Sequence, residues 1–290
     1  MKRSMTVQAI AASTLLSIIV SSCIACDRRE DLDDEYRNSK YWGEVTTKEY
    51  DMKDFVNIES DANVNIVYIQ SDTFKVVAKG NEKAIEEYSF NIENPMEFDK
   101  KPTLVATGNE SKGLREVPSI RLYVYAPTLS FISISGAGDF DTHNGTTFGD
   151  IKILSMGAGD IDLNDITCGN INISCTGAGD VKVRRLTASN LWAETSGAGD
   201  IDLRKVSGVK YADFSATSAG DIDCDIQADT IKAMSQGAGD IDLEVDCKQI
   251  SVESTGSGEI EIEGNADQLI RGKSALGLIT TKHLHAKKVI

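Results

Sequence analysis

A Gly-Ala-Gly-Asp motif recurs along the second half of the chain at nearly constant intervals. When the copies are aligned on the acid after the second glycine, their spacings are 21, 20, 20, 21, 19 and 19 residues. A degenerate eighth copy places Leu278 at the same position, 19 residues further on. Self-similarity at a fixed short period is typical of proteins built from stacked repeats. The aligned acids are Asp139, Asp160, Asp180, Asp200, Asp221, Asp240 and Glu259.

Alternating apolar residues flank each copy of the motif. In the copies from Asp160 to Glu259, the residues one and three positions after the acid are apolar, and so are the residues seven and nine positions before it. This period of two predicts a β-strand with one buried face on either side of each motif. We therefore expect an all-β fold, a single-stranded parallel β-helix with ~20-residue coils and the right-handed crossover usual for parallel strands. One inward column would contain Ile161, Ile201, Ile222 and Ile241.

We interpret the motif itself as the corner between these strands. Glycine adopts the positive φ that so tight a turn demands, and the acid can accept hydrogen bonds from N–H groups of the corner. The second glycine is present in every copy, whereas Ser218 replaces the first glycine once, so the second position has the stricter backbone requirement. The predicted structural corner residues are Gly138, Asp139, Gly159, Asp160, Gly179, Asp180, Gly199, Asp200, Gly220, Asp221, Gly239 and Asp240.

Two ligand-binding interpretations compete with the corner. A phosphate-binding glycine loop requires a helix after it, but here a strand follows. Calcium-binding β-rolls also repeat Gly-x-Gly-x-Asp, although with a nine-residue period, so specific calcium ligation stays an open alternative. We predict no metal site and no cofactor. We expect a second, more exposed acidic column that attracts divalent cations only weakly. That column is Asp141, Asp162, Asp202, Asp223, Asp242 and Glu261, interrupted by Lys182.

The N-terminal residues read as a targeting signal rather than as part of the fold. A basic start, an apolar stretch and small residues before a cysteine predict a signal peptide at residues 1–22. Val20-Ser21-Ser22-Cys23 matches a bacterial lipobox, and Cys23 is the predicted lipidation site. Cys26 is the weaker candidate, because Cys23 would then occupy the aliphatic position of the motif. Residues 23–43 are polar and mostly acidic, which predicts a flexible tether.

Residues 44–290 are predicted to form one β-helical domain. Residues 44–130 lack the repeat but alternate as strands, and we expect them to cover the open end of the repeats at 131–290. No cysteine pair is placed for a disulfide: Cys175 and Cys224 point inward, and Cys168 and Cys247 lie four coils apart. The net charge of −15 argues against nucleic acid as a partner.

The segments "FVNIESDANVNIVYIQ", "RLYVYAPTLSFISISGAGDFD" and the stacked "GAGDIDL" copies are similar to a known bacterial family. From about Glu44 to Lys288 the chain resembles the family described as "putative auto-transporter adhesin, head GIN domain", whose function is unknown. The resemblance implies a β-helical fold and a place in the cell envelope. With the lipobox, it predicts an outer-membrane lipid-anchored protein at the cell surface or on the periplasmic face. Acidic residues soon after the lipidated cysteine often accompany export to the surface in similar lipoproteins.

Two functions from different classes fit these features. The first is a non-catalytic binding or adhesion-like module that presents a regular surface to a glycan or to an envelope or extracellular protein. The second is a polysaccharide lyase or glycosidase, since β-helices also host such enzymes. An enzyme of this kind needs a singular pair of acids in a cleft and aromatic platforms for sugar. Because the acids here are periodic and the chain is only 6% aromatic, we favour the binding module and predict no catalytic residues.

Overall fold

Our computed structural model describes residues 39–93, 101–109, 117–274 and 278–290. The signal peptide, Cys23 and most of the tether expected from the sequence lie outside the described residues. The described part begins at Ser39 and forms one compact unit. It is built mainly of strands, and within these ranges the only helices are the short α3 (Ser39–Trp42) and α4 (Glu82–Ile85). None of the described helices is long and apolar enough to cross a bilayer.

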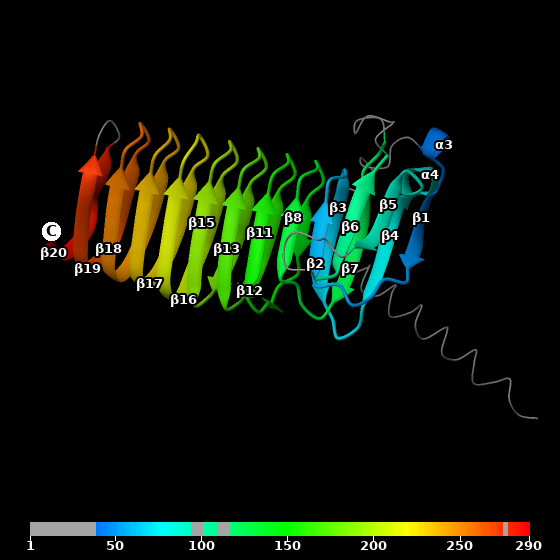
Figure 1. The fold of residues 1–290 in the computed structure, drawn as a ribbon, viewed down its shortest axis with the longest axis horizontal. Helices are drawn as coiled ribbons and strands as arrows, with labels where there is room; N and C mark the ends of the chain where they lie inside the picture. Colours follow the sequence, from blue (N-terminus) through cyan, green and yellow to red (C-terminus); the bar gives the residue numbers. More distant parts are fainter. Residues whose placement is uncertain (1–38, 94–100, 110–116, 275–277) are drawn as a thin grey trace, which may run out of the picture. The chain divides into compact units, whose positions relative to one another are not determined.

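The repeats form a parallel β-helix in which each coil has two strand faces (Figure 1). We call the strands after each Gly-Ala-Gly-Asp corner the post-corner face, and those before each corner the pre-corner face. The strands of both faces pair in parallel from coil to coil. On the post-corner face lie β9 (Phe140–Thr142), β10 (Thr146–Thr147), β12 (Ile161–Thr167) and β14 (Val181–Thr187). On the pre-corner face lie β8 (Phe131–Ile134), β11 (Ile151–Ser155), β13 (Asn170–Cys175) and β15 (Asn190–Thr195).

Later coils are longer continuous strands that bend from one face to the other. They are β16 (Ile201–Ala216), β17 (Ile222–Ser235), β18 (Ile241–Ser254) and β19 (Ile260–Ser274). β16 completes a 21-residue coil and pairs with β17 through two register shifts, where Lys205 and Gly208 have positive φ. This coil is two residues longer than the 19-residue coil that follows it. Both extra residues are absorbed in the bend opposite the corner, which leaves the corners aligned.

Side chains from the two faces meet inside the coils and fill them. Ile161, Ile201, Ile222 and Ile241 are each 0% exposed, which confirms the predicted inward column. A second, small inward column is also fully buried, and its polar members hydrogen-bond to corner carbonyls; Thr195 Oγ1 donates to the carbonyl oxygen of Gly220 at 2.9 Å. The buried hydroxyls are thus satisfied. The second column consists of Ser155, Cys175, Thr195, Ala216, Ser235 and Ser254.

The N-terminal part extends the stack instead of only covering it. β2 (Asn57–Ser60) and β3 (Val64–Gln70) pair in parallel with β8 and β9, and so form the coil before the first repeat. β6 (Thr103–Gly108) and β7 (Ile120–Ala126) pair in parallel with β2 and β3 and form the coil before that. Beyond it the pairing becomes antiparallel, with β5 (Tyr88–Glu93) on β6, β4 (Lys75–Asn81) on β7, and β1 (Val45–Tyr50) on β4.

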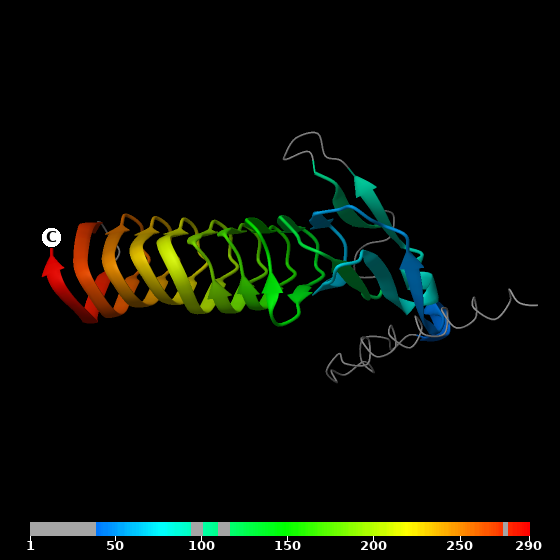
Figure 2. The ribbon, with the colours of Figure 1, turned by 90° about the horizontal axis from the view of Figure 1, so that it is seen from below.

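The two ends of the described unit differ (Figure 2). At the N-terminal end, Trp42 of α3 is buried against the core, so the folded part begins before Glu44 and includes the last residues of the expected tether. At the other end, β20 (Ile279–Val289) pairs in parallel with β19 as a final coil. Most side chains of β20 are exposed or half-buried.

Candidate functional site

The corner residues singled out from the sequence lie in one line along the stack. Each predicted second glycine is buried, and the acid after it is exposed or half-buried. The coil made by β2 and β3 contributes to the same line, because Ala62 and Val64 lie beneath Gly136 and Gly138. The corners therefore form a continuous column from the N-terminal part to the last repeats.

Close packing of backbones, rather than positive φ, requires glycine in these corners. Among the described glycines, positive φ occurs at Gly43, Gly145, Gly208 and Gly264, none of them in a Gly-Ala-Gly-Asp motif. The expectation that the corner glycines adopt positive φ is therefore wrong. A Cβ on Gly179 would fall on the carbonyl oxygen of Gly159 one coil earlier, and the same holds for each second glycine from Gly159 to Gly258.

The acids of the first column form a hydrogen-bonded ladder. The backbone N–H of Asp180 donates to Asp160 Oδ1 at 2.9 Å, and the N–H of Asp200 donates to Asp180 Oδ1 at 3.0 Å. The same bond recurs at every step from Asp139 to Glu259. The donor belongs to the next coil and not to the same corner. Asn65 begins the ladder, since its Oδ1 accepts from the N–H of Asp139 at 3.1 Å.

Backbone N–H groups and Lys182 compensate the negative charge of the aligned carboxylates. Lys182 lies 3.1 Å from Asp180 and 3.8 Å from Asp160, measured from Nζ to the carboxylate oxygens. Burial acts to raise the pKa of Asp180, but the hydrogen bond from the Asp200 backbone and the contact with Lys182 outweigh it and lower that pKa. Asp180 is thus held as a charged acceptor.

The second acidic column faces outward from the post-corner face. Asp202, Asp223, Asp242 and Glu261 lie directly opposite one another on successive coils. It is not uniformly the more exposed column: Asp202 and Glu261 are half-buried, whereas Asp200 and Asp240 of the first column are exposed. Partial burial, followed by repulsion from neighbouring carboxylates, raises the pKa of Asp223 and raises that of Asp242 to about 6.

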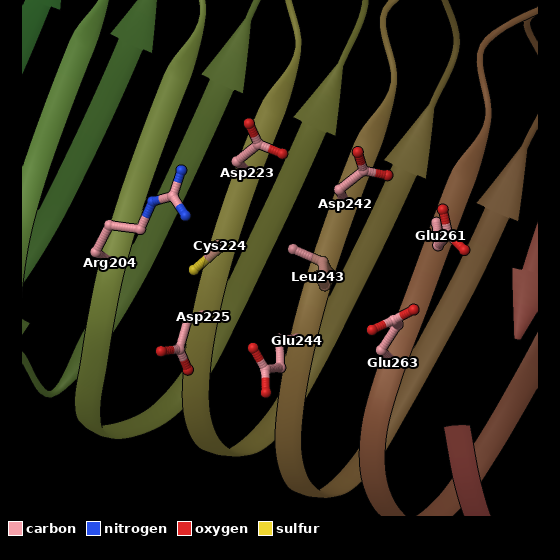
Figure 3. A pocket seen from close by; sticks show the side chains of 9 residues that line it. All are labelled: Arg204, Asp223, Cys224, Asp225, Asp242, Leu243, Glu244, Glu261 and Glu263. Carbon is pink, nitrogen blue, oxygen red and sulfur yellow. The ribbon is translucent and has the colours of Figure 1, made fainter. Parts of the chain in front are cut away.

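A shallow hollow of about 300 Å³ lies over this column (Figure 3). Its charged lining is six carboxylates in two columns, together with Arg204 at one end. Arg204 Nη2 lies 3.0 Å from Asp202 Oδ2 and so neutralises the nearest acid.

Within the described ranges, no three histidine, cysteine or acidic side chains are placed to hold one metal ion. Weak binding of divalent cations by the outer column stays a prediction. The six carboxylates belong to Asp223, Asp225, Asp242, Glu244, Glu261 and Glu263.

The cysteines of the described part are free and buried. Cys168, Cys175, Cys224 and Cys247 form no disulfide with one another, in agreement with the predicted columns. Burial raises the pKa of Cys168 to about 12 and that of Cys247 to about 11. These thiols are therefore protonated at neutral pH and are poor nucleophiles.

Sequence reasoning passed over one surface residue, Trp192. It lies at an outward position of β15, opposite Asn172 of β13 and Asp213 of β16, and is 37% exposed. Its ring lies 6.2 Å from that of Tyr211, measured between centroids. The strand alternation in "NLWAET" places an aromatic residue at a polar, outward position, and this signal could have identified it.

The family model described as "Putative auto-transporter adhesin, head GIN domain" matches residues 54–224 and 205–290. The chain belongs to this family. No curated protein matches the chain.

Several solved structures share the fold of this family member. One, described as a "putative adhesin" from Bacteroides fragilis NCTC 9343, is 26% identical; the match covers 76% of this chain and 97% of that one, with a TM-score of 0.68. A "Putative lipid binding protein" from Parabacteroides distasonis ATCC 8503 is 19% identical, with coverage of 83% and 98% and a TM-score of 0.69. A "putative adhesin" from Parabacteroides merdae ATCC 43184 is 17% identical, with coverage of 83% and 97% and a TM-score of 0.63.

Proposed function

We propose that this protein is a non-catalytic binding module of the cell envelope, anchored by a lipid on Cys23. Its β-helix would present a regular outer surface to a glycan or to an envelope or extracellular protein. The observation that carries the proposal is the alignment of outward side chains from coil to coil along the paired strand faces, which offers a repeated surface. The adhesin descriptions of two similar structures and of the family point the same way.

Periodic placement of the acids supports a binding role over a catalytic one. A glycosidase needs two carboxylates whose environments differ, one kept as an acid and one as a base or nucleophile. In the acidic hollow each carboxylate lies opposite a similar one on the next coil. Asp242, whose pKa is raised to about 6, is the residue that a lyase or glycosidase would use as its acid. Loss of polysaccharide cleavage in Asp242→Asn would favour that second function; we expect no cleavage by the wild type.

A lipid-binding function is described for one of the similar structures. Here the side chains of the coils fill the interior, with aliphatic columns at 0–4% exposure. The acidic hollow is lined mainly by charged groups. Neither environment suits an acyl chain, so we favour a polar ligand over a lipid.

The proposed anchor and location can be tested together. Mass spectrometry of the mature N-terminus should find a diacylglyceryl group on Cys23, and Cys23→Ala should release the protein from the membrane fraction. Protease digestion of intact cells separates the cell surface from the periplasmic face, with the released Cys23→Ala protein as the reference for intrinsic digestibility. A mature chain that begins at Cys26, or at an unmodified residue, would contradict the anchor.

A further inference from the structure

One row of outward side chains on the pre-corner face is uncharged along six successive coils. Its members lie opposite one another in the parallel pairing of β13, β15, β16, β17, β18 and β19. Each is half-buried, and each has an amide or a hydroxyl group. We call this set the amide–hydroxyl row, and it consists of Asn170, Asn190, Tyr211, Thr230, Gln249 and Gln268.

The amide–hydroxyl row contrasts with the acidic columns of the post-corner face. The chain is 26% charged and has a net charge of −15, yet none of the six coils contributes a charge to this row. Because adjacent coils are spaced by ~4.8 Å, the row is a line of roughly 24 Å. Such a surface can recognise a ligand by hydrogen bonds at equal intervals without selecting it by charge.

Much of the hydrogen-bonding capacity of the row is unused by the protein. Within the described ranges, the side chains of Thr230, Gln249 and Gln268 make no hydrogen bond. At the other end of the row, Asn190 Nδ2 donates to Asn170 Oδ1 at 2.8 Å. An amide has two N–H donors and a carbonyl acceptor, and a hydroxyl can also do both. The row can therefore donate to and accept from the hydroxyl groups of a ligand.

An aromatic ring beside the row is held in place while it remains in contact with solvent. Trp192 lies two residues after Asn190 on the same face of β15, and its indole packs at 52° to the ring of Tyr211. The hydroxyl of Tyr211 donates to Asp213 Oδ2 at 2.9 Å, which fixes that ring. An exposed indole gains little for folding from the hydrophobic effect, so Trp192 is better suited to contact with a ligand.

A hollow of about 480 Å³ lies where the indole and the row meet. Asn170, Asn172 and Trp192 form part of its lining. Asn172 is exposed and lies directly opposite Trp192 on the preceding coil, which places its amide beside the indole. Charged side chains of both signs also line the hollow. Its ligand is therefore defined by the aromatic face and the amides.

We infer that an uncharged polysaccharide binds along the amide–hydroxyl row, with one pyranose ring in the hollow. The C–H face of that ring would lie against the electron-rich face of Trp192, and Asn172 would bind its hydroxyls. Further sugar units would follow the row past Thr230 and Gln249. A protein partner fits less well, because the core of a protein interface is a cluster of apolar side chains, whereas the row has one aromatic ring among amides and a threonine. This inference rests on the proposed binding function and assigns its ligand class.

The test uses the full-length protein, purified from membranes in a detergent without a sugar headgroup. Cellohexaose and mannohexaose are the neutral probes, and hexagalacturonate is the anionic comparison. Calorimetric titration should show binding of at least one neutral hexamer, with an affinity that added salt leaves unchanged. Trp192→Ala should weaken it roughly tenfold or more, as truncation of a central aromatic contact does. Trp192→Tyr should retain most of the affinity.

Glutamines inside and outside the row provide a matched pair of variants. Gln249→Ala should weaken the neutral hexamer roughly fivefold, as loss of a hydrogen bond does. Gln227→Ala, at an exposed position of β17 outside the row, should leave the affinity unchanged. Thermal melting of each variant shows that it is folded. Equal losses in the two glutamine variants, or equal binding by wild type and Trp192→Ala, would overturn the site.

The ligand class and the proposed function have separate readouts. Binding of hexagalacturonate as tight as that of both neutral hexamers would overturn the uncharged class, and failure of both neutral hexamers would overturn the inference. Adhesion of whole cells to a deglycosylated protein surface, lost in Trp192→Ala, would assign the row to a protein partner and overturn the glycan. In each case, adhesion of whole cells that is lost in Cys23→Ala would still support the proposed function.

Discussion

At each corner the second glycine presents its bare Cα to the carbonyl oxygen of the glycine one coil earlier. The acid beside it accepts the backbone N–H of the next coil. The two residues thus act between coils. Glycine lets the backbones of two neighbouring coils approach closely, and aspartate accepts a hydrogen bond from a backbone N–H group that has no partner in the strand pairing. Exchange of either residue should therefore affect stability much more than an exchange elsewhere on the surface.

Gly179→Ala should destabilise the protein by ~2 kcal/mol or more, because the new methyl group would overlap a backbone oxygen that cannot move alone. Gly149 is the matched control, since a Cβ there meets nothing within 4 Å and its φ is not positive. We expect Gly149→Ala to change the free energy of unfolding by less than ~0.5 kcal/mol. Urea titration of both variants measures the difference, and equal losses would contradict the close-packing explanation.

Asp200→Ala should cost ~1–3 kcal/mol, because the N–H of Asp221 loses the acceptor that lies 2.8 Å away. Asp200→Asn retains an acceptor oxygen, so we expect it to recover at least half of the loss. Asp225, an exposed acid outside the ladder, provides the control, and Asp225→Ala should stay within ~0.5 kcal/mol of wild type. If Asp200→Ala and Asp225→Ala unfold at the same urea concentration, the ladder does not contribute to stability.

Strands of the post-corner face place like charges opposite one another, which is unfavourable in a sheet. Burial first, and repulsion between neighbouring carboxylates second, raise the pKa of Asp223 and Asp242. Basic residues reduce the cost at one end of the column, where Lys182 lies between Asp162 and Asp202 in register. Toward the last coils, Asp223, Asp242 and Glu261 follow without a basic residue between them. We expect this part of the face to be the most sensitive to pH and salt.

Asp242→Asn should stabilise the protein at pH 7.5 and have little effect near pH 4. Burial and neighbouring acids raise the pKa of Asp242 from 3.8 to about 6, so between these values the folded protein holds a proton that the unfolded chain has lost. Wild-type stability therefore falls as pH rises through this interval, and the variant lacks that loss. Urea unfolding at both pH values measures it. Asp246→Asn is the control, because Asp246 lies opposite uncharged Gln227 and Asn265; an equal gain there would contradict local repulsion.

For the whole molecule, strand alternation was enough to predict the coil, its inward columns and the alignment of the acids. Ile201 and Cys224 lie where the period of two places them. The reason for glycine could not be predicted, since close approach depends on how two coils stack and not on one turn. The order of the N-terminal strands in the stack could not be predicted either. β2 and β3 lie between strands that come later in the chain, and no local sequence pattern encodes such a pairing. Trp192 was not predicted, because it is not one of the repeated residues.

Removal of residues 279–290 should leave a folded protein that has lost only its final strand, β20. β20 pairs only with β19 among the described strands, and its side chains are mostly exposed. Removal of everything before Phe131 should instead give aggregates, because Ile132 and Phe140 would lose the buried neighbours Ile58 and Ile66. Size-exclusion chromatography and circular dichroism distinguish these results. A soluble, folded protein without the N-terminal strands would show that the repeats need no cap.

The hydrogen bonds that join neighbouring coils all run along the stacking direction, while the covalent chain winds across it. A pulling force applied between the first and last coils would therefore load the weakest links in series, and one coil would detach before the next is strained. Each released coil of about 20 residues would lengthen the molecule by ~70 Å at full extension. Under tension the protein would unfold one coil at a time, would lengthen by a similar amount at each step, and would dissipate mechanical work each time a coil detaches. Single-molecule stretching should record that sawtooth, with the outermost coil, the one ending in β20, released first.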